Sequence, residues 1–270
     1  MFEIVEKSQL GEGIKKMVIR APDIAARACP GQFVILRIDD KGERIPLTIS
    51  AAEGKKGLIT LIFQEVGFST AKLGGLSAGE KIRDVLGPLG RPTEIKRYGA
   101  VVCVGGGVGV AELLPVAQGL ADAGNTVIGI IGARNKQAVI LSEELKAICH
   151  CLHITTDDGS QGKKGLVTDA LKDIISARKI DLVYAIGPVA MMSAVCDLTL
   201  KDNIKTKVSL NPIMVDGTGM CGSCRVNVGG EIKFCCLDGP DFDGHKVDFK
   251  ELGQRVKLFN EQERSVCKGQ

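Results

Sequence analysis

Three cysteines and one aspartate lie close together in a glycine-rich stretch of the C-terminal part of the sequence. Cys221 and Cys224 are separated by two residues, Cys236 follows after eleven more, and Asp216 precedes Cys221 by five positions. Plant-type iron–sulfur loops use C-x4-C-x2-C and a distant fourth cysteine. The stretch has this spacing with an aspartate in first place, and a carboxylate keeps the single negative charge of a thiolate. The pattern predicts a 2Fe–2S cluster whose potential is shifted by the harder oxygen ligand.

A zinc ribbon and a disulfide are the alternatives at this stretch. Zinc usually takes a second tight cysteine pair, but the second pair here, Cys235 and Cys236, is adjacent in sequence. Two adjacent residues do not easily reach one metal, and the spacing alone does not fix which of them is a ligand. Gly217, Gly219 and Gly222 allow the tight backbone turns that a loop around an inorganic core needs.

A second glycine-rich stretch, residues 105–109, lies between an apolar run and a helical stretch. Glycines in that position let a pyrophosphate approach the backbone and the helix N-terminus. Three further predicted strands end in residues 132–134, 156–160 and 187–191, which are polar or rich in glycine. Because ligands bind at the carboxyl ends of the strands in such a sheet, we expect a dinucleotide site there. Its candidate residues are Gly105, Gly106, Gly107, Val108, Gly109, Gly132, Arg134, Asp157, Asp158, Gly187, Pro188 and Met191.

The charged residues of this site bear on the choice of nucleotide. Arg134 is suited to a phosphate, and Asp157 and Asp158 are suited either to ribose hydroxyls or to capping their own turn. The two carboxylates would repel a 2′-phosphate, whereas the arginine would attract one. We expect NAD(H) rather than NADP.

Two segments of the N-terminal part are candidates for a flavin site. Residues 44–49 offer an arginine for a pyrophosphate and a threonine for the isoalloxazine ring. Residues 67–70 precede a short predicted helix and offer a second phosphate cradle. Each signal is weak alone, because an Arg–Pro turn before a strand is more often structural. The candidate residues are Arg44, Pro46, Leu47, Thr48, Ile49, Gly67, Ser69 and Thr70.

The elements that position these residues change type along the chain. Up to about residue 97 the sequence has short β-branched runs bounded by glycine, proline or charge, which predict an antiparallel β-barrel. From residue 98 apolar runs alternate with helical stretches, which predicts a parallel α/β domain. We therefore expect a fold of class β plus α/β with three parts: a barrel over 1–97, an α/β domain over 98–210 and a small 2Fe–2S segment over 211–270.

The composition of the chain limits the partners and the cellular location that we expect for it. The 270 residues hold 35 basic and 32 acidic side chains, a balance that does not indicate nucleic acid or an anionic membrane as a partner. The sequence has no apolar run long enough for a membrane span and no basic-then-apolar signal pattern, so we expect a cytoplasmic protein with reduced thiols. His150, His153 and His245 show no catalytic or metal spacing, and no catalytic side chain is assigned. The remaining cysteines are expected to be buried hydrophobes or unpaired thiols: Cys29, Cys103, Cys149, Cys151, Cys196 and Cys267.

The order of the sites resembles the ferredoxin–NADP reductase superfamily, and within it the electron-transfer subunits of the dihydroorotate dehydrogenase type. In that family R-x-P-[LIF]-[TS] and G-x-x-[ST] hold FAD, and G-G-G-x-G and G-P-x-x-M hold the nicotinamide nucleotide. Many relatives have a cysteine before G-P, where this chain has Ile186, so that role is absent or altered. The cluster stretch is similar to that of the small (alpha) subunits of NADH-dependent reduced ferredoxin:NADP oxidoreductase and of sulfide dehydrogenase. The resemblance implies the ligands Asp216, Cys221, Cys224 and Cys236, with Cys235 a bystander.

The resemblance also implies a function. Hydride would pass between nicotinamide and FAD, and single electrons between FAD and the cluster, which faces a larger partner subunit with a second FAD and further iron–sulfur clusters. In the ferredoxin-linked enzyme that complex bifurcates electrons from NADPH to NAD and ferredoxin. The alternatives are dihydroorotate oxidation, against which Asp216 speaks, sulfide or polysulfide reduction, and a zinc-stabilised nucleotide-binding regulator without redox turnover.

Overall fold

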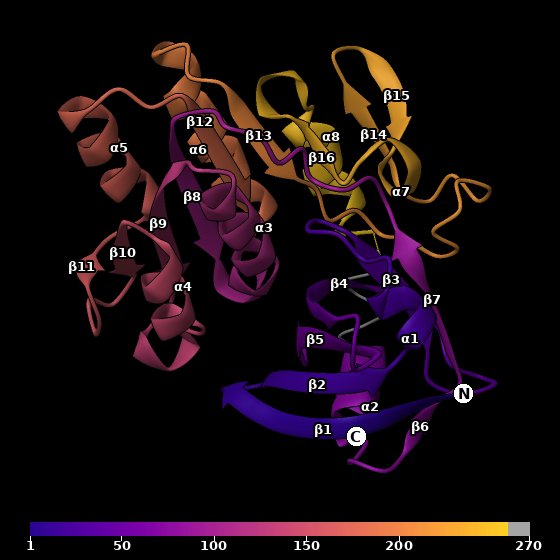
Figure 1. Cartoon of the computed structure of the whole chain (residues 1–270). Coiled ribbons are helices and arrows are strands. Elements are labelled where there is room, and N and C mark those ends of the chain that lie inside the picture. The colour runs from indigo at the N-terminus through magenta and orange to yellow at the C-terminus, as the bar shows by residue number, and fades with distance from the viewer. Residues whose placement is uncertain (259–270) are drawn as a thin grey trace.

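Two seven-stranded sheets and one two-stranded sheet make up the protein in the computed structural model, which describes residues 1–258 (Figure 1). The first sheet, in indigo and purple, lies at the bottom of Figure 1, and the second lies at the upper left. The C-terminal elements, in yellow, lie at the upper right. Cys267 and the end of the segment 211–270 lie outside the described residues.

The N-terminal sheet is antiparallel, with the strand order β6-β1-β2-β5-β4-β3-β7. Its inward-facing side chains, among them Met17, Leu36, Leu61 and Phe63, form one core around which the sheet wraps. The predicted antiparallel barrel is confirmed. The elements are β1 (Phe2–Gly11), β2 (Ile14–Arg20), α1 (Pro22–Ala25), β3 (Phe33–Arg37), β4 (Arg44–Glu53), β5 (Leu58–Gln64), α2 (Phe68–Gly75), β6 (Lys81–Ile82) and β7 (Asp84–Leu89).

The second sheet has the order β11-β10-β9-β8-β12-β13-β16, and all pairs but the last are parallel. Apolar cores cover both faces, which explains why its central strands are continuous apolar runs. The predicted parallel α/β domain is confirmed. Its elements are β8 (Ala100–Gly106), η1 (Gly107–Gly109), α3 (Val110–Asp122), β9 (Thr126–Ala133), η2 (Lys136–Ala138), α4 (Ser142–Ile148), β10 (Cys151–Thr156), β11 (Lys163–Lys164), α5 (Val167–Ala177), β12 (Leu182–Ile186), α6 (Val189–Lys201) and β13 (Thr206–Ser209).

The C-terminal segment is built onto the second sheet. Strand β16 (Asp241–Asp243) pairs antiparallel with β13, and Cys224, Val226 and Cys235 share an apolar core with Val208. The rest of the segment consists of a hairpin and short helices, and its conformation therefore depends on the sheet beneath it. These elements are β14 (Arg225–Val228), β15 (Glu231–Phe234), α7 (Cys235–Asp238), η3 (Gly244–Lys246) and α8 (Phe249–Arg255).

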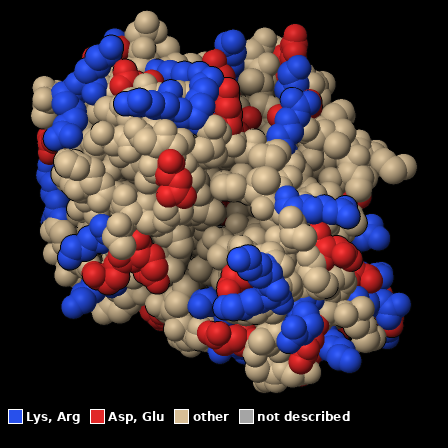
Figure 2. Space-filling model, viewed as in Figure 1, with Lys and Arg blue, Asp and Glu red and all other residues tan. Residues whose placement is uncertain are grey.

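Strand β4 of the barrel lies against the start of helix α3. The hydroxyl of Ser50 donates to the carbonyl of Ala111 at 2.8 Å, and the hydroxyl of Thr48 donates to the carboxylate of Glu112. This contact places a predicted flavin strand beside the helix that follows the glycine-rich turn. Lys, Arg, Asp and Glu side chains are interspersed over the face in Figure 2. Within residues 1–258 no helix combines the length and apolarity that crossing a membrane requires.

Candidate functional site

The polar strand ends of the second sheet meet at one edge. Gly106 at the end of β8 is paired with Gly132 of β9, and Gly132 with Thr155 of β10. On the other side of β8, Gly105 is paired with Ile186 at the end of β12. The register therefore brings the four predicted nucleotide segments to the carboxyl edge of adjacent strands, where a nucleotide binds in sheets of this type.

The glycines of the two central turns permit a close approach of backbone to backbone. A Cβ on Gly106 would overlap the sulfur of Met191, and one on Gly109 would lie 2.9 Å from the carbonyl oxygen of Ile186. These two glycines thus allow the β8–α3 turn to pack on the β12–α6 turn. Gly107 is different: its φ is +56°, and no atom lies within 4 Å of the position of its Cβ. The space beside its Cα is therefore open, which leaves room for a pyrophosphate to approach the turn.

The two aspartates that follow β10, Asp157 and Asp158, differ in the contacts of their carboxylates. The carboxylate of Asp158 accepts hydrogen bonds from the amide and the hydroxyl of Ser160, at 2.9 and 2.6 Å. The bond from the Ser160 hydroxyl lowers the pKa of Asp158, so this carboxylate caps its own turn. Asp157 is exposed, and its side chain makes no hydrogen bond within residues 1–258. Of the two aspartates, Asp157 is therefore the one whose carboxylate is available for a ribose.

The two predicted flavin segments are brought together in the structure. The hydroxyl of Ser69, in the first turn of α2, donates to the carboxylate of Glu43 at 2.9 Å, and Arg44 is the next residue. Arg44 is exposed and forms no ion pair among the described residues. Thr70 accepts hydrogen bonds from the amides of Val66 and Gly67, so its hydroxyl caps the helix. A free guanidinium near a helix N-terminus fits the pyrophosphate of FAD.

The cluster loop holds Asp216 in a defined position. Its two carboxylate oxygens accept the amides of Thr218 and Cys221, each at 2.7 Å. These hydrogen bonds, the one from Thr218 above all, lower the pKa of Asp216, so its carboxylate stays charged, as any carboxylate that could bind a metal must. Gly217 has a φ of +73°, and a Cβ there would lie 2.7 Å from side-chain atoms of both Ile35 and Leu89. The loop therefore packs directly on strands β3 and β7 of the barrel.

The thiols of Cys224 and Cys236 face each other, whereas that of Cys235 points elsewhere. The sulfurs of Cys224 and Cys236 are 3.2 Å apart, near the roughly 3.8 Å that two thiolates on one tetrahedral ion would have with metal–sulfur bonds of about 2.3 Å. Cys235 is fully buried, and its thiol points at the carbonyl of Leu210. Within residues 1–258 no three acidic, cysteine or histidine side chains surround a single ion position. A 2Fe–2S cluster places two ligands on each of two irons, and the pairs Cys224–Cys236 and Asp216–Cys221 fit that arrangement.

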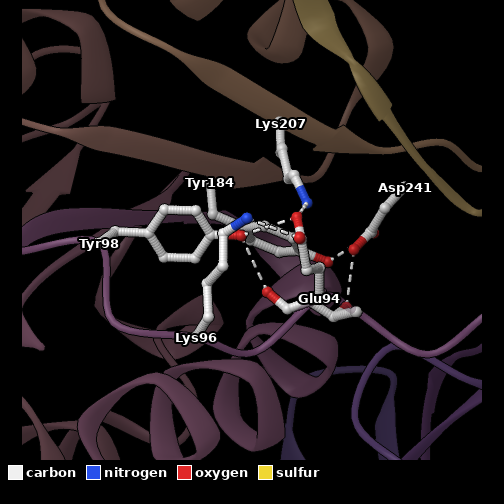
Figure 3. A network of polar contacts seen from close by, with 7 residues as sticks. Glu94, Lys96, Tyr98, Tyr184, Lys207 and Asp241 are labelled. Atoms are coloured by element: carbon white, nitrogen blue, oxygen red, sulfur yellow. Dashed lines mark hydrogen bonds and ion pairs between the residues drawn. The ribbon is translucent and has the colours of Figure 1, made fainter. Parts of the chain in front are cut away.

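A polar network that the sequence analysis did not find joins the three parts of the chain (Figure 3). Asp241 of β16 accepts the hydroxyl of Tyr184 of β12 at 2.8 Å and that of Thr93 at 2.7 Å. Burial raises the pKa of Asp241. Beside it, Glu94 pairs with Lys207 at 2.9 Å, and its hydrogen bonds with Lys96, Lys207 and Tyr98 lower its pKa to about 2.

Glu112 is the other residue that the sequence analysis missed. It lies in the first turn of α3, where an acidic residue is ordinarily explained by the helix dipole alone. Here its carboxylate accepts the hydroxyl of Thr48 from the barrel, and burial raises the pKa of Glu112 to about 7. This environment could not be predicted from the sequence, because Thr48 and Glu112 are 64 positions apart and meet only where β4 packs against α3.

A barrel, a parallel α/β sheet with a glycine-rich nucleotide edge and a cysteine loop between them define a flavin-dependent, nicotinamide-linked oxidoreductase. The comparisons with known proteins agree. Residues 103–197 match the oxidoreductase NAD-binding domain, and residues 211–248 match the iron–sulfur cluster binding domain of dihydroorotate dehydrogenase B.

Relatives that match most of the chain define its family within this class of oxidoreductases. The electron transfer subunit homolog of dihydroorotate dehydrogenase B from Thermotoga maritima is 47% identical over 263 residues, which cover 97% of this chain and 93% of that protein. The corresponding electron transfer subunit from Desulforamulus reducens is 34% identical, covering 86% and 91%. Among solved structures, a chain from a study of flavin-based electron bifurcation in the NADH-dependent reduced ferredoxin-NADP oxidoreductase is 46% identical, with a TM-score of 0.93 and coverage of 98% and 95%.

The chain belongs to the family of dihydroorotate dehydrogenase B electron transfer subunits and their homologues. It is an electron-transfer subunit of an oxidoreductase, and its cofactors are FAD, a 2Fe–2S cluster and NAD(H). A subunit of this kind works beside a catalytic partner subunit.

Proposed function

We propose that this chain is the small subunit of an electron-bifurcating NADH-dependent reduced ferredoxin:NADP oxidoreductase. The observation that carries the proposal is Asp216, held as a charged carboxylate by two amides at the first ligand position. The resemblance assigns an aspartate ligand to the subunits of that enzyme and four cysteines to dihydroorotate-linked ones. The high similarity to a chain of the ferredoxin-linked enzyme supports the same choice.

The roles of the residues follow the three parts of the chain, which we propose to be 1–97, 98–210 and 211–270. FAD is held by Arg44, Thr48 and the residues around them on β4, together with the N-terminus of α2. NAD(H) is held by the strand-end residues of the second sheet. The flavin mediates because nicotinamide moves two electrons at once and an iron–sulfur cluster moves one.

The cluster ligands are proposed as two pairs. Cys224 and Cys236 bind one iron, because their sulfurs already lie 3.2 Å apart. Asp216 and Cys221 bind the other, because the carboxylate accepts the amide of Cys221. Cys235 stays outside the cluster, with its thiol buried against Leu210.

The partner in this proposal is a larger subunit with a second flavin and further iron–sulfur clusters, through which ferredoxin is reached. In the full reaction two NADPH supply four electrons, of which two reduce NAD and two reduce two ferredoxins. We place the complex in the cytoplasm, where thiolate ligands stay reduced.

The first test is the cofactor content of the anaerobically purified protein. About one flavin, two irons and two acid-labile sulfides per chain are expected, whereas zinc without flavin or sulfide would leave the nucleotide-binding regulator as the better reading. The second test uses the complex with its co-purifying partner. NADPH should reduce ferredoxin only when NAD is present, and dihydroorotate should not reduce the flavin.

A second candidate remains the electron-transfer subunit of dihydroorotate dehydrogenase, because the family match over 211–248 carries that name. In that case the partner would be an FMN-containing barrel, and dihydroorotate would reduce NAD through the complex. NADPH-dependent ferredoxin reduction would then be absent. The sulfide dehydrogenase subunit is tested in the same preparation by adding polysulfide with NADPH.

A further inference from the structure

We propose that Glu112, acting through the hydroxyl of Thr48, is a positioning residue that holds the proton released when the flavin passes its electrons to the cluster. The inference rests on the proposed binding of FAD at strand β4. It adds a residue that neither the motifs nor the family resemblance assigns.

The chemistry of the chain requires a place for one proton. A hydride brings two electrons and one proton to the flavin, whereas an iron–sulfur cluster accepts electrons one at a time and takes no proton. When both electrons have left, one proton remains and must go to a base. In the reverse direction, the same base must return a proton before hydride can form.

The geometry places a carboxylate at this point. Thr48 lies on β4 among the proposed flavin contacts, and its hydroxyl donates to Oε1 of Glu112 at the start of α3. Both side chains are partly buried where the barrel meets the α/β domain. As the oxygen of Thr48 accepts a proton from the flavin side, its own hydroxyl proton passes to Oε1 of Glu112. The carboxylate becomes a carboxylic acid, and the threonine is unchanged.

The surroundings adapt Glu112 to this task. Burial raises its pKa to about 7, the hydrogen bond from Thr48 opposes that rise, and the charge of Asp241 adds to it. Another ionisable group whose pKa the charge of Glu112 raises is Tyr184 of β12, and burial is the main reason that its pKa lies well above the ordinary value. Tyr184 is uncharged at neutral pH, whereas the pKa of Glu112 lies where a carboxyl both takes up and releases a proton.

The first test is the pH dependence of thermal unfolding of the cofactor-loaded protein, for the wild type and for Glu112→Gln. The folded protein keeps the proton on Glu112 to a higher pH than the unfolded chain does. The wild type should therefore lose stability, relative to the variant, as the pH rises from about 4.5 to about 7. Asp122→Asn, at the exposed end of the same helix, is the matched control and should follow the wild-type profile. Identical profiles for the wild type and Glu112→Gln would overturn the proposal.

The second test follows reoxidation of the flavin after stoichiometric reduction by NADH, as a function of pH, in the complex with its co-purifying partner and an excess of a one-electron acceptor that takes both electrons from the cluster. At pH 7 Glu112→Gln should be slower by about 10²-fold, the lower end of what a positioned proton acceptor contributes, and its rate should lose the titration near pH 7. Thr48→Val, which keeps the carboxylate but breaks the relay, should show the same loss. A normal rate in either variant would refute the relay. Flavin content and NADH reduction of the wild type test the proposed function separately, so the two failures are distinguishable.

Discussion

Removal of one hydroxyl from the network between the three parts of the chain should destabilise the whole protein. Tyr184→Phe takes away the donor that lies 2.8 Å from Oδ1 of Asp241, while the aromatic ring keeps its volume in the core. Tyr184 is almost fully buried, at 1% exposure, so water cannot replace the lost hydroxyl. A hydrogen bond to a charged group contributes about 1.5–3 kcal/mol. We expect a loss near 2 kcal/mol, seen as a fall in Tm of roughly 4–8 °C.

The other tyrosine of the sequence, Tyr98, provides a matched control, because its hydroxyl makes the same kind of contact with a carboxylate at the surface. The hydroxyl of Tyr98 contacts the carboxylate of Glu94 at 3.0 Å, but that carboxylate is half exposed and also pairs with Lys96 and Lys207 (Figure 3). Tyr98→Phe should cost less than about 1 kcal/mol. Thermal unfolding of the cofactor-loaded variants, measured side by side, gives the comparison.

The pH dependence of the stability lost in Tyr184→Phe tests whether the missing hydrogen bond to Asp241 is the cause of that loss. Burial raises the pKa of Asp241, and its hydrogen bonds with Thr93 and Tyr184 lower it again. Without the Tyr184 hydroxyl this pKa should rise further, so the folded state gives up its proton at a higher pH. The deficit of Tyr184→Phe should be small at acidic pH, where the carboxyl is protonated in both proteins, and should grow towards neutral pH. A deficit equal to that of Tyr98→Phe, or one independent of pH, would refute the reasoning.

Four further substitutions test the cluster and nucleotide sites. Asp216→Cys should keep a 2Fe–2S cluster but move its midpoint potential and EPR signal, because a softer ligand replaces oxygen; an unchanged spectrum would remove Asp216 from the ligand set. Cys236→Ala should lose iron and sulfide, whereas Cys235→Ala should keep the cluster and cost only about 1 kcal/mol for its buried sulfur, and the opposite result would move the ligand by one residue. Gly107→Ala should cost about 1–2 kcal/mol because its φ is +56°, and should raise the Kd for NADH in fluorescence titrations; unchanged binding would argue against a backbone contact there.

The sequence allowed the two large parts of the fold to be predicted because their patterns are local. Apolar runs such as residues 100–104 and 182–186 indicate strands covered on both faces, and they lie in β8 and β12 of the structure. Strand β1 was not predicted, because apolar and charged residues do not alternate regularly in Phe2–Gly11. Strand β16 has three residues and pairs with β13 only after the cluster segment folds back onto the sheet.

The sequence by itself predicted a 2Fe–2S cluster and a dinucleotide site, because the spacing of Asp216, Cys221 and Cys224 and the turn at residues 105–109 are short-range patterns with a specific chemical use. FAD followed from the family resemblance. Tertiary structure decided what lies between these sites. Glu112 meets Thr48, and Asp241 meets Tyr184, across 64 and 57 positions of the chain. No local pattern encodes such pairs, because each depends on how a barrel, a sheet and a loop pack together. Burial then sets the pKa of each carboxyl, and burial exists only in the folded molecule.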